Sequence, residues 1–362
     1  MKMSWVRRLL TVEGIVRLSR TLGASLALLL AGSAVAAAPA PSAQQCWLVG
    51  YETAVRCVAI TVPLSYDEPE GDTVTLTAAV ASALSARPAA DALFVFAGGP
   101  GQSGRDLSGW LNSGFRHIVR DRDIVFVDVR GTGRSDPLNC EAEANVAMMT
   151  PNDFTRLMAV CATLYGARAG HHSAREIVED TEFLRLALGY DQISIWGGSF
   201  GTRVAQHYAR VYPEHLHAVI LDAFAPVGRS LFVDAPRFAE RSLELLFADC
   251  ASDARCQAAF PRLRQDFARL LARAESEGVS GLVADPRTGE LVQVRIDRDV
   301  IAGIVRGGLY SAFSRALVPL AIERALDGDL GPMMGLAAAT ASWSTDTMAL
   351  GMGVGYLCAE DV

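Results

Sequence analysis

The sequence predicts an α/β fold in which a doubly wound, mostly parallel sheet is followed by a helical segment. Four short apolar runs carry this prediction, at residues 93–96, 124–127, 193–196 and 218–221. Strands of a parallel sheet are buried on both faces and are therefore continuously apolar, as these runs are. Helical patterns separate the last three runs, and alternating strands and helices are typical of this fold class.

Local signals place the two intervening helices. Ser173 and Glu176 form a capping-box pattern, and apolar residues follow at helical spacing as far as Gly189. A second helix is expected to begin directly after Ser199 and to end before Pro213, whose ring cannot continue a helix. Both helices therefore have a predicted start and a predicted end.

The rest of the chain divides into a hairpin before these strands and a helical segment after them. Residues 57–62 and 73–81 are strand-like and flank a turn-rich stretch, which predicts a β-hairpin. We expect the core of the fold to cover residues 39–227. Residues 228–362 are rich in Ala, Leu and Arg, with a hairpin-like interruption near Asp285, and are expected to form an inserted helical cap.

Residues 1–38 have the order of a secretory signal peptide. Five basic residues precede a short apolar run, 22–31, and small residues with an Ala-x-Ala pattern follow. The apolar run is shorter than the roughly 20 helical residues that span a bilayer. We therefore expect cleavage, a secreted or periplasmic location, and no stable membrane association of the mature chain. An uncleaved N-terminal anchor is the alternative.

Composition excludes several classes of partner. Of the 362 residues, 51% are hydrophobic and 20% are charged, which supports a large core and argues against a disordered chain. The formal net charge is -7 and the body of the chain has no basic run, so no nucleic-acid partner is expected. No two cysteines have C-x-x-C spacing and no histidine pair lies near them, so no metal site is expected.

Seven cysteines suit an exported protein, because disulfides persist outside the cytosol. Six of them lie in pairs that are close in the sequence, and we expect these pairs to be bridged: Cys46 with Cys57, Cys140 with Cys161, and Cys250 with Cys256. Other connectivities stay open, because sequence alone does not establish pairing. Cys358 has no partner in this scheme.

The strongest chemical motif is Gly197-Gly198-Ser199-Phe200-Gly201, which lies between a predicted strand and a predicted helix. Its glycines let the backbone pack closely in a strained turn, and the turn raises the serine hydroxyl above the sheet. The dipole of the following helix favours negative charge that develops there. Ser199 is therefore the expected nucleophile, and a glycine-rich turn that happens to contain serine is the alternative.

A second glycine-rich loop, residues 97–104, directly follows the strand predicted at 93–96. Beside a nucleophile of this kind, such a loop supplies one backbone donor to the oxyanion, and the residue after the serine supplies the other. The expected donors are the N–H groups of Gly99 and Phe200. A phosphate-binding loop is the rival, but the G-K-[ST] ending of such loops is absent.

These two motifs and the Asp-Val-Arg-Gly-Thr-Gly-Arg-Ser stretch at 128–135 resemble the prolyl aminopeptidase and tripeptidyl aminopeptidase family of α/β-hydrolases. The resemblance covers about residues 46–226 and is closest to the secreted tripeptidyl branch, whose members carry paired cysteines and Gly-Gly-Ser-Phe-Gly-Thr at the elbow. The chain departs from the prolyl branch at Ala97, where that branch has histidine. It implies an α/β-hydrolase fold with a cap, and a peptide substrate with a free N-terminus from which one or a few residues are cleaved through an acyl-enzyme. We expect no metal or organic cofactor for this chemistry.

The stretch 358–361 also resembles a segment of this family, at the cap. An exopeptidase must recognise the α-ammonium group of its substrate, and carboxylates near the cleft are suitable partners. Glu360 and Asp361 are therefore candidates for binding the amine. A solvated acidic chain end is the alternative.

No histidine of the chain fits the role of general base for Ser199. The triad of this fold follows the order serine, acid, histidine, and all six histidines precede the predicted cap: His117, His171, His172, His207, His215 and His217. Asp222 is a candidate acid at the catalytic edge of the sheet, with a structural role in the turn as the alternative. We interpret the missing base, the missing last strands and the unpaired Cys358 as signs of C-terminal truncation, and expect the base and two strands beyond Val362.

Three functions follow from this interpretation. The first is an exported aminopeptidase that is inactive as this chain. The second is an esterase or lipase, because the two glycine motifs do not distinguish amides from esters. The third is a non-catalytic fragment on a hydrolase scaffold. If strands are missing, the strand at 218–221 should also be an open, apolar edge of the sheet.

Overall fold

The computed structural model describes residues 41–140, 151–284, 288–340 and 348–360. The chain divides into two units, Met1–Ala38 and Pro39–Val362, and the described residues belong to the second. The signal-peptide prediction for residues 1–38 lies outside the described residues. Among the described helices, none is long and apolar enough to cross a membrane.

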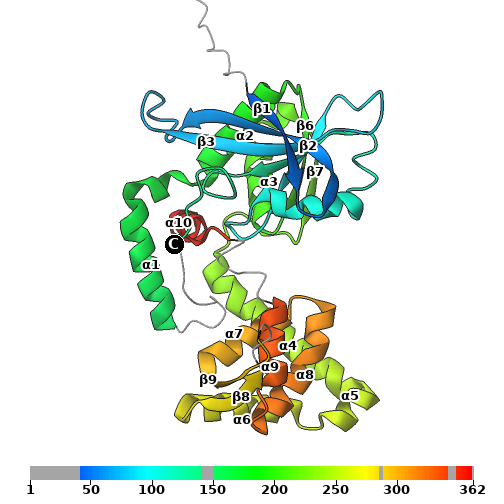
Figure 1. The fold of residues 1–362 in the computed structure, drawn as a ribbon, viewed down its shortest axis with the longest axis vertical. Helices are drawn as coiled ribbons and strands as arrows, with labels where there is room; N and C mark the ends of the chain where they lie inside the picture. Colours follow the sequence, from blue (N-terminus) through cyan, green and yellow to red (C-terminus); the bar gives the residue numbers. More distant parts are fainter. Residues whose placement is uncertain (1–40, 141–150, 285–287, 341–347, 361–362) are drawn as a thin grey trace, which may run out of the picture. The chain divides into compact units, whose positions relative to one another are not determined.

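Seven strands of the described chain form one sheet, in the order β1-β2-β3-β5-β4-β6-β7. Figure 1 shows this sheet, with β1, β2, β3, β6 and β7 labelled. They are β1 (Ser42–Leu48), β2 (Tyr51–Pro63), β3 (Thr73–Ala81), β4 (Ala92–Phe96), β5 (Ile124–Asp128), β6 (Ile193–Gly198) and β7 (Leu216–Asp222). β4 pairs in parallel with β5 and β6, and β6 pairs in parallel with β7. β1, β2, β3 and β5 are joined by antiparallel pairing. The predicted α/β fold is confirmed, and so is the predicted hairpin, which is β2 and β3.

The central strands are continuously apolar because both faces of the sheet are covered. The helices that follow the strands are η1 (Gly104–Asn112), α1 (Pro151–Tyr165), η3 (Gly166–His171), α2 (Ala174–Leu188), α3 (Phe200–Val211) and η4 (Pro213–His215). Every residue of β4 and β5 is buried. One hydrophobic cluster joins the sheet to α2 and α3 through Ile177 and Val204. A second cluster joins the opposite face to η1 and the turn after it through Leu111 and Phe115.

Both predicted helices of the core are present. Gly189 ends α2 in the left-handed conformation, with φ of 81°, and its N–H group bonds to the Arg185 and Leu186 carbonyls. The capping box at the start of α2 forms only in part. The Ser173 hydroxyl donates to the Glu176 carboxylate, but it caps no backbone N–H group.

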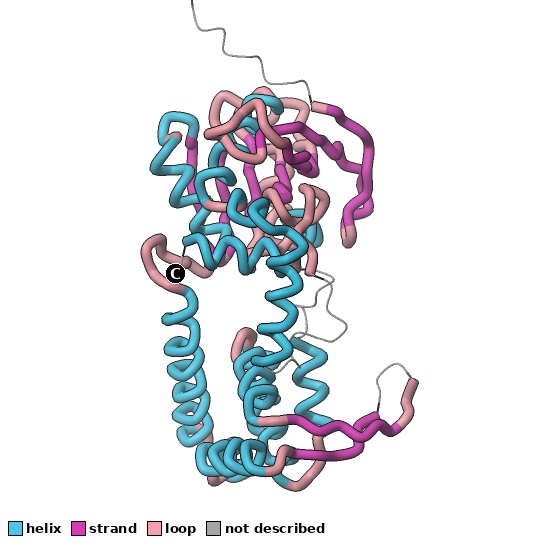
Figure 2. The backbone as a smooth tube through the Cα atoms, turned by 90° about the vertical axis from the view of Figure 1, so that its left-hand side faces the viewer, coloured by secondary structure: helices cyan, strands magenta, loops and turns pink. Residues whose placement is uncertain are grey.

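Helices and one hairpin make up the described chain after β7 (Figure 2). They are α4 (Leu231–Ser252), α5 (Ala254–Ala259), α6 (Leu263–Ser276), β8 (Val279–Ala284), β9 (Leu291–Ile296), α7 (Arg298–Gly308), α8 (Ala312–Leu326), α9 (Gly331–Thr340) and α10 (Leu350–Glu360). The hairpin predicted near Asp285 is present as the antiparallel pair β8 and β9, although Asp285 itself lies outside the described residues. A separate hydrophobic cluster holds α6, α7 and α8 together through Leu270, Ile301 and Ile322.

Helix α10 departs from the predicted cap, residues 228–362. Its Met352 and Tyr356 side chains belong to the hydrophobic cluster of the sheet and not to the cluster of the other cap helices. The ring of Tyr356 lies edge-on to the ring of Phe200, with centroids 4.7 Å apart. The sequence of an apolar helix does not show which hydrophobic core the helix will join. The composition of residues 228–362 therefore suggested a single cap, whereas α10 packs with the sheet and the other cap helices form a core of their own.

Strand β7 is an edge strand within the described residues, with β6 as its neighbour. Val219, Ile220 and Leu221 are 36%, 46% and 40% exposed, although they form the apolar part of the strand. The predicted open, apolar edge is therefore present in the described chain.

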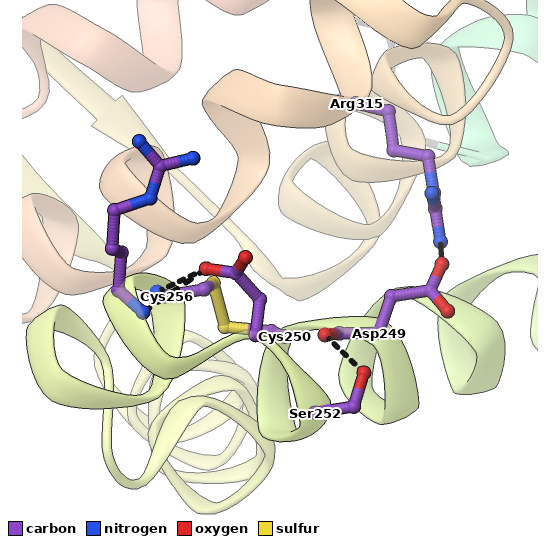
Figure 3. Close-up of a disulfide and its surroundings, with 7 residues drawn as sticks. Asp249, Cys250, Ser252, Cys256 and Arg315 are labelled. Atoms are coloured by element: carbon purple, nitrogen blue, oxygen red, sulfur yellow. Dashed lines mark hydrogen bonds and ion pairs between the residues drawn. A yellow bond between two sulfur atoms is a disulfide. The ribbon is translucent and has the colours of Figure 1, made fainter.

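All three predicted disulfides are confirmed. The Cα atoms are 5.8 Å apart in Cys46–Cys57, 5.4 Å in Cys140–Cys161 and 5.0 Å in Cys250–Cys256, within the usual range for a bridge. Cys358 is free and exposed. Figure 3 shows the Cys250–Cys256 bridge between α4 and α5, beside an ion pair of Asp249 with Arg315 of α8.

Candidate active site

Ser199 occupies a strained turn between β6 and α3. Its φ of 52° and ψ of -115° are rare for a residue with a side chain, and such strain is concentrated at functional sites. The flanking glycines are required by contacts. A Cβ atom on Gly197 would lie 2.2 Å from the Gly201 carbonyl oxygen, and one on Gly201 would lie 2.3 Å from the Phe96 carbonyl oxygen. The local structure is therefore the strand-to-helix elbow that the sequence predicts.

The glycine-rich loop after β4 passes directly beside Ser199. The loop follows β4, which pairs in parallel with β6, so the loop and the elbow leave the sheet at the same edge. A Cβ atom on Gly98 would lie 3.2 Å from Ser199 Cβ and 3.7 Å from Ser199 Oγ. Gly99 and Gly101 have φ of +110° and +118°, a backbone conformation that glycine tolerates best. The structure thus brings the predicted oxyanion loop and the predicted nucleophile together.

A buried carboxylate ties this loop to the next strand. Asp128 ends β5 and has no exposed surface. It accepts hydrogen bonds from Ser103 Oγ at 2.6 Å, Thr77 Oγ1 at 3.1 Å and the Arg134 N–H at 3.2 Å. The Arg105 guanidinium lies 2.8 Å from the same carboxylate. The sequence motif that begins at Asp128 therefore supports the loop beside Ser199, a role that its spacing alone did not reveal.

Asp222 approaches Ser199 through its backbone. The Ser199 N–H donates to the Asp222 carbonyl at 2.8 Å, and Asp222 pairs with Gly198 across the sheet. The next residue, Ala223, also has a positive φ, of 53°. Asp222 therefore lies at the end of β7 beside the turn of Ser199, and its role as the triad acid stays a prediction.

The described histidines make their contacts elsewhere. Burial lowers the pKa of His172 to about 4, and its Nδ1 lies 2.9 Å from the Arg168 carbonyl. His215 lies 3.1 Å from the Glu182 carboxylate and stacks on Tyr212. Burial also lowers the pKa of His207, which projects from α3. Among the contacts of the described residues, none joins a histidine to Ser199.

A pocket of about 600 Å³ opens at Ser199, within the unit Pro39–Val362. Its lining residues come from the loop after β7, the first half of α4 and the end of α7, and they are largely apolar: Ala223, Phe224, Ala225, Pro226, Leu231, Ala235, Phe238, Ala239, Ser242, Leu309 and Tyr310, with Arg229, Asp234 and Arg306 as the charged members. Apolar walls with a few polar groups are typical of a small-molecule or peptide site.

Residues 91–273 match the alpha/beta hydrolase fold family, and this match covers more than half of the chain. The chain belongs to this family. The elbow, the loop beside it and the parallel strands that position them all lie within the matched residues.

Relatives of this α/β hydrolase carry the names of peptidases. It is 27% identical over 226 residues to serine protease Hip1 of Mycobacterium tuberculosis, covering 55% of this chain and 42% of that protein. It is 23% identical over 197 residues to the tripeptidyl aminopeptidase of Streptomyces coelicolor, covering 48% and 36%. It is 29% identical over 180 residues to the proline iminopeptidase of Aeromonas sobria, covering 47% and 37%. The predicted membership of the α/β-hydrolases is confirmed, and the matches span less than half the length of these peptidase relatives.

An ion pair lies on the wall of the hydrolase pocket. Arg229 Nε and Nη2 donate to the two oxygens of Asp234 at 2.7 Å and 2.8 Å. These bonds lower the pKa of Asp234, so its carboxylate is ionised at neutral pH. Sequence reasoning did not single out either residue, because they carry no motif and reach the pocket only through the packing of α4.

Helix α3 of the hydrolase fold holds in place the loop after β7, which lines the pocket. Thr202 Oγ1 donates to the Ser199 carbonyl at 2.6 Å and accepts from the Ala225 N–H at 2.9 Å. Gln206, one turn later, donates to the Ala225 carbonyl at 2.9 Å and accepts from the Val227 N–H at 3.2 Å. Helix α3, which begins at the elbow, therefore also positions the part of the pocket wall that the loop after β7 forms.

Glu360, one of the two acidic candidates at the chain end, does not line this pocket. The Glu360 carboxylate accepts a hydrogen bond of 3.0 Å from the Ala174 N–H, at the start of α2, and Glu360 is not among the residues that line the pocket. Its position corrects the prediction that it lies at the cleft. Free N–H groups in the first turn of a helix attract a carboxylate, which explains the contact. Asp361 lies outside the described residues.

Among the described residues, no group of three or more His, Cys, Asp or Glu side chains is arranged to hold a metal ion.

Proposed function

We propose that this α/β hydrolase is an exported serine aminopeptidase, with Ser199 as nucleophile and the N–H groups of Gly99 and Phe200 as oxyanion donors. The observation that carries the proposal is the position of Ser199, a strained elbow residue with the glycine loop beside it and a pocket in front of it. The names of the relatives favour a peptide bond as the target. Three disulfides and the pattern of residues 1–38 support export.

The proposed reaction begins with attack of Ser199 Oγ on the carbonyl carbon of the scissile bond. The carbonyl oxygen becomes negatively charged, and the two backbone N–H groups stabilise it. Loss of one such donor costs about 3 kcal/mol of transition-state stabilisation. The serine proton must pass to a base and then to the leaving amine before water releases the acyl group. No described histidine contacts Ser199, so turnover by this chain is expected to be slow.

Recognition of a free N-terminus requires a carboxylate in the pocket, and Asp234 meets this need where Glu360 does not. The Asp234 side chain is 10% exposed, is ionised and lines the same pocket as Ser199. Arg229 uses one lone pair of each carboxylate oxygen, and Arg237 Nη1 lies 4.0 Å from Oδ1, beyond hydrogen-bond distance. Each oxygen can therefore accept a further hydrogen bond from a substrate ammonium group.

Binding measurements test the amine recognition without requiring turnover. The Ser199→Ala variant would be titrated by calorimetry with a tripeptide arylamide and with the same compound acetylated at its N-terminus. We expect acetylation to weaken binding by about tenfold, the value of a charge-assisted hydrogen bond. Asp234→Asn, introduced in addition, should remove most of this difference. Equal affinities for both compounds would contradict an aminopeptidase.

Hydrolysis assays separate the peptidase from the other two functions. Release of arylamine from the tripeptide arylamide by the natural chain, absent in Ser199→Ala, supports the peptidase. Hydrolysis of a p-nitrophenyl ester alone would assign an esterase. Absence of both activities, together with no covalent labelling of Ser199 by a fluorophosphonate, would assign a non-catalytic protein on a hydrolase scaffold.

A further inference from the structure

Helix α10 begins against the glycine loop that carries the proposed oxyanion donor Gly99. The Ala349 N–H donates to the Gly101 carbonyl at 2.9 Å, and Gln102 and Met348 form a β-bridge. A Cβ atom on Gly99 would lie 2.8 Å from Met348 Cε. Met348 and Ala349 are 8% and 4% exposed, so these contacts exclude water.

The glycine loop and the start of α10 lie so close together that each needs a glycine at the contact. A Cβ atom on Gly101 would lie 2.7 Å from the Ala349 carbonyl oxygen. One on Gly353, in the first turn of α10, would lie 2.6 Å from the Pro100 carbonyl oxygen. Gly98 of the same loop faces Ser199. The loop therefore has the proposed nucleophile against Gly98, and the segment from Met348 to Gly353 against the next three residues.

A disulfide supports α10 in turn. The Gly351 N–H donates to the Leu138 carbonyl at 2.9 Å, and a Cβ atom on Gly351 would lie 2.9 Å and 3.1 Å from the sulfurs of Cys161 and Cys140. On the same helix, the Tyr356 ring packs on Phe200, the residue that follows the proposed nucleophile. Helix α10 is thus held by a hydrogen bond, by packing against a disulfide and by an aromatic contact, none of which depends on the loop itself.

We propose that the segment Met348, Ala349 and the first turn of α10 through Gly353 is a positioning element for the oxyanion loop. This inference rests on the proposed function, because the loop matters for catalysis only if Ser199 is a nucleophile. Oxyanion donors act through preorganisation, and a misplacement of about 1 Å at a reacting centre costs roughly a hundredfold in rate. The segment touches no substrate; it acts through the backbone of Gly99 to Gln102.

The test is the variant Gly353→Ala, with Gly335→Ala as the matched control. A methyl group at Gly353 must displace the Pro100 carbonyl, whereas Gly335 lies in α9 with no atom within 4 Å of its Cβ position. Labelling of Ser199 by a fluorophosphonate would be followed by mass spectrometry over a range of probe concentrations, which separates the affinity for the probe from the maximal labelling rate. We expect Gly353→Ala to lower the maximal rate by at least about tenfold at unchanged probe affinity. The control should match the natural chain.

A second pair of variants distinguishes a positioning role from a general loss of structure. Met348→Ala removes the side chain that touches Gly99, and Met348→Leu keeps most of its volume, so the first should slow labelling and the second should restore it. A purely structural role would lower the melting temperature, probe affinity and labelling rate together. Equal labelling rates in Gly353→Ala, Met348→Ala and the natural chain would overturn the inference.

Amide exchange keeps the two proposals distinguishable. If the natural chain shows no labelling at Ser199, the proposed nucleophile fails, and deuterium exchange of residues 98–104 and of the Ala349 amide then decides the inference alone. Faster exchange there in Gly353→Ala, but not in Gly335→Ala, supports the positioning role. Unchanged exchange overturns it.

Discussion

The buried ion pair of Arg130 with Asp180 provides a test of how this fold is held together. Arg130 has no exposed side-chain surface, and it binds Asp180 with Nε at 2.7 Å and Nη2 at 2.5 Å. Its remaining N–H groups donate to the Leu64, His171 and Pro63 carbonyls at 2.7, 2.9 and 3.1 Å. The guanidinium therefore joins the end of β5 to α2, to the hairpin and to the end of η3. All of its donors are used.

Asp180→Asn is expected to destabilise the protein strongly. The variant keeps the volume of the side chain but removes the charge opposite a guanidinium that has no access to water. Breaking a buried pair from one side costs about 3–5 kcal/mol, because the remaining charge stays buried without compensation. The Tyr66 hydroxyl, which donates to Asp180 Oδ1 at 2.8 Å, would lose its charged acceptor as well.

Asp67→Asn is the matched control for this prediction. Asp67 also makes a two-bond ion pair with an arginine, Arg175, with both distances at 2.7 Å. Its side chain is 69% exposed and that of Arg175 is 55% exposed, so water replaces the lost interaction. Urea denaturation followed by circular dichroism should show a large loss of stability for Asp180→Asn and little change for Asp67→Asn. Equal losses of unfolding free energy in the two variants would refute the argument that burial of the ion pair determines how much its removal destabilises the protein.

Four further predictions concern other parts of the molecule. Burial lowers the pKa of His172 to about 4, from 6.5 for an exposed histidine, so the unfolded state binds the extra proton. Stability should therefore fall as the pH drops from about 6.5 to about 4, and His172→Gln should flatten this slope in urea titrations at several pH values. Replacing both Cys140 and Cys161 by serine should lower the free energy of unfolding by about 3 kcal/mol, since this bridge closes a loop with a sequence separation of 21. Calorimetry should show a smaller loss when the Cys250–Cys256 bridge is removed, because its sequence separation is 6. Residues 39–362 should self-associate through the exposed edge of β7, and Ile220→Lys should raise the soluble monomer fraction measured by light scattering. Ser199 should label only slowly with a fluorophosphonate; rapid labelling of a monomeric preparation would show that a base acts within this chain.

The sequence by itself determined the features whose causes are local. Buried parallel strands need unbroken apolar residues, and β4, β5 and β6 were recognisable for that reason. The elbow could be predicted because the contact that excludes a side chain at Gly197 comes from Gly201, four residues later. The three bridges also join cysteines that are close in the sequence.

The tertiary structure alone decided which acid lines the pocket and which helix supports the glycine loop. Glu360 and Asp234 are both carboxylates after the core, and their local patterns do not tell them apart. α4 carries Asp234 to the pocket, whereas α10 packs on the sheet and leaves Glu360 at the start of α2. The position of each helix depends on the apolar contacts of the whole chain, which are spread over many residues distant in sequence. A pattern of a few neighbouring residues contains no such information.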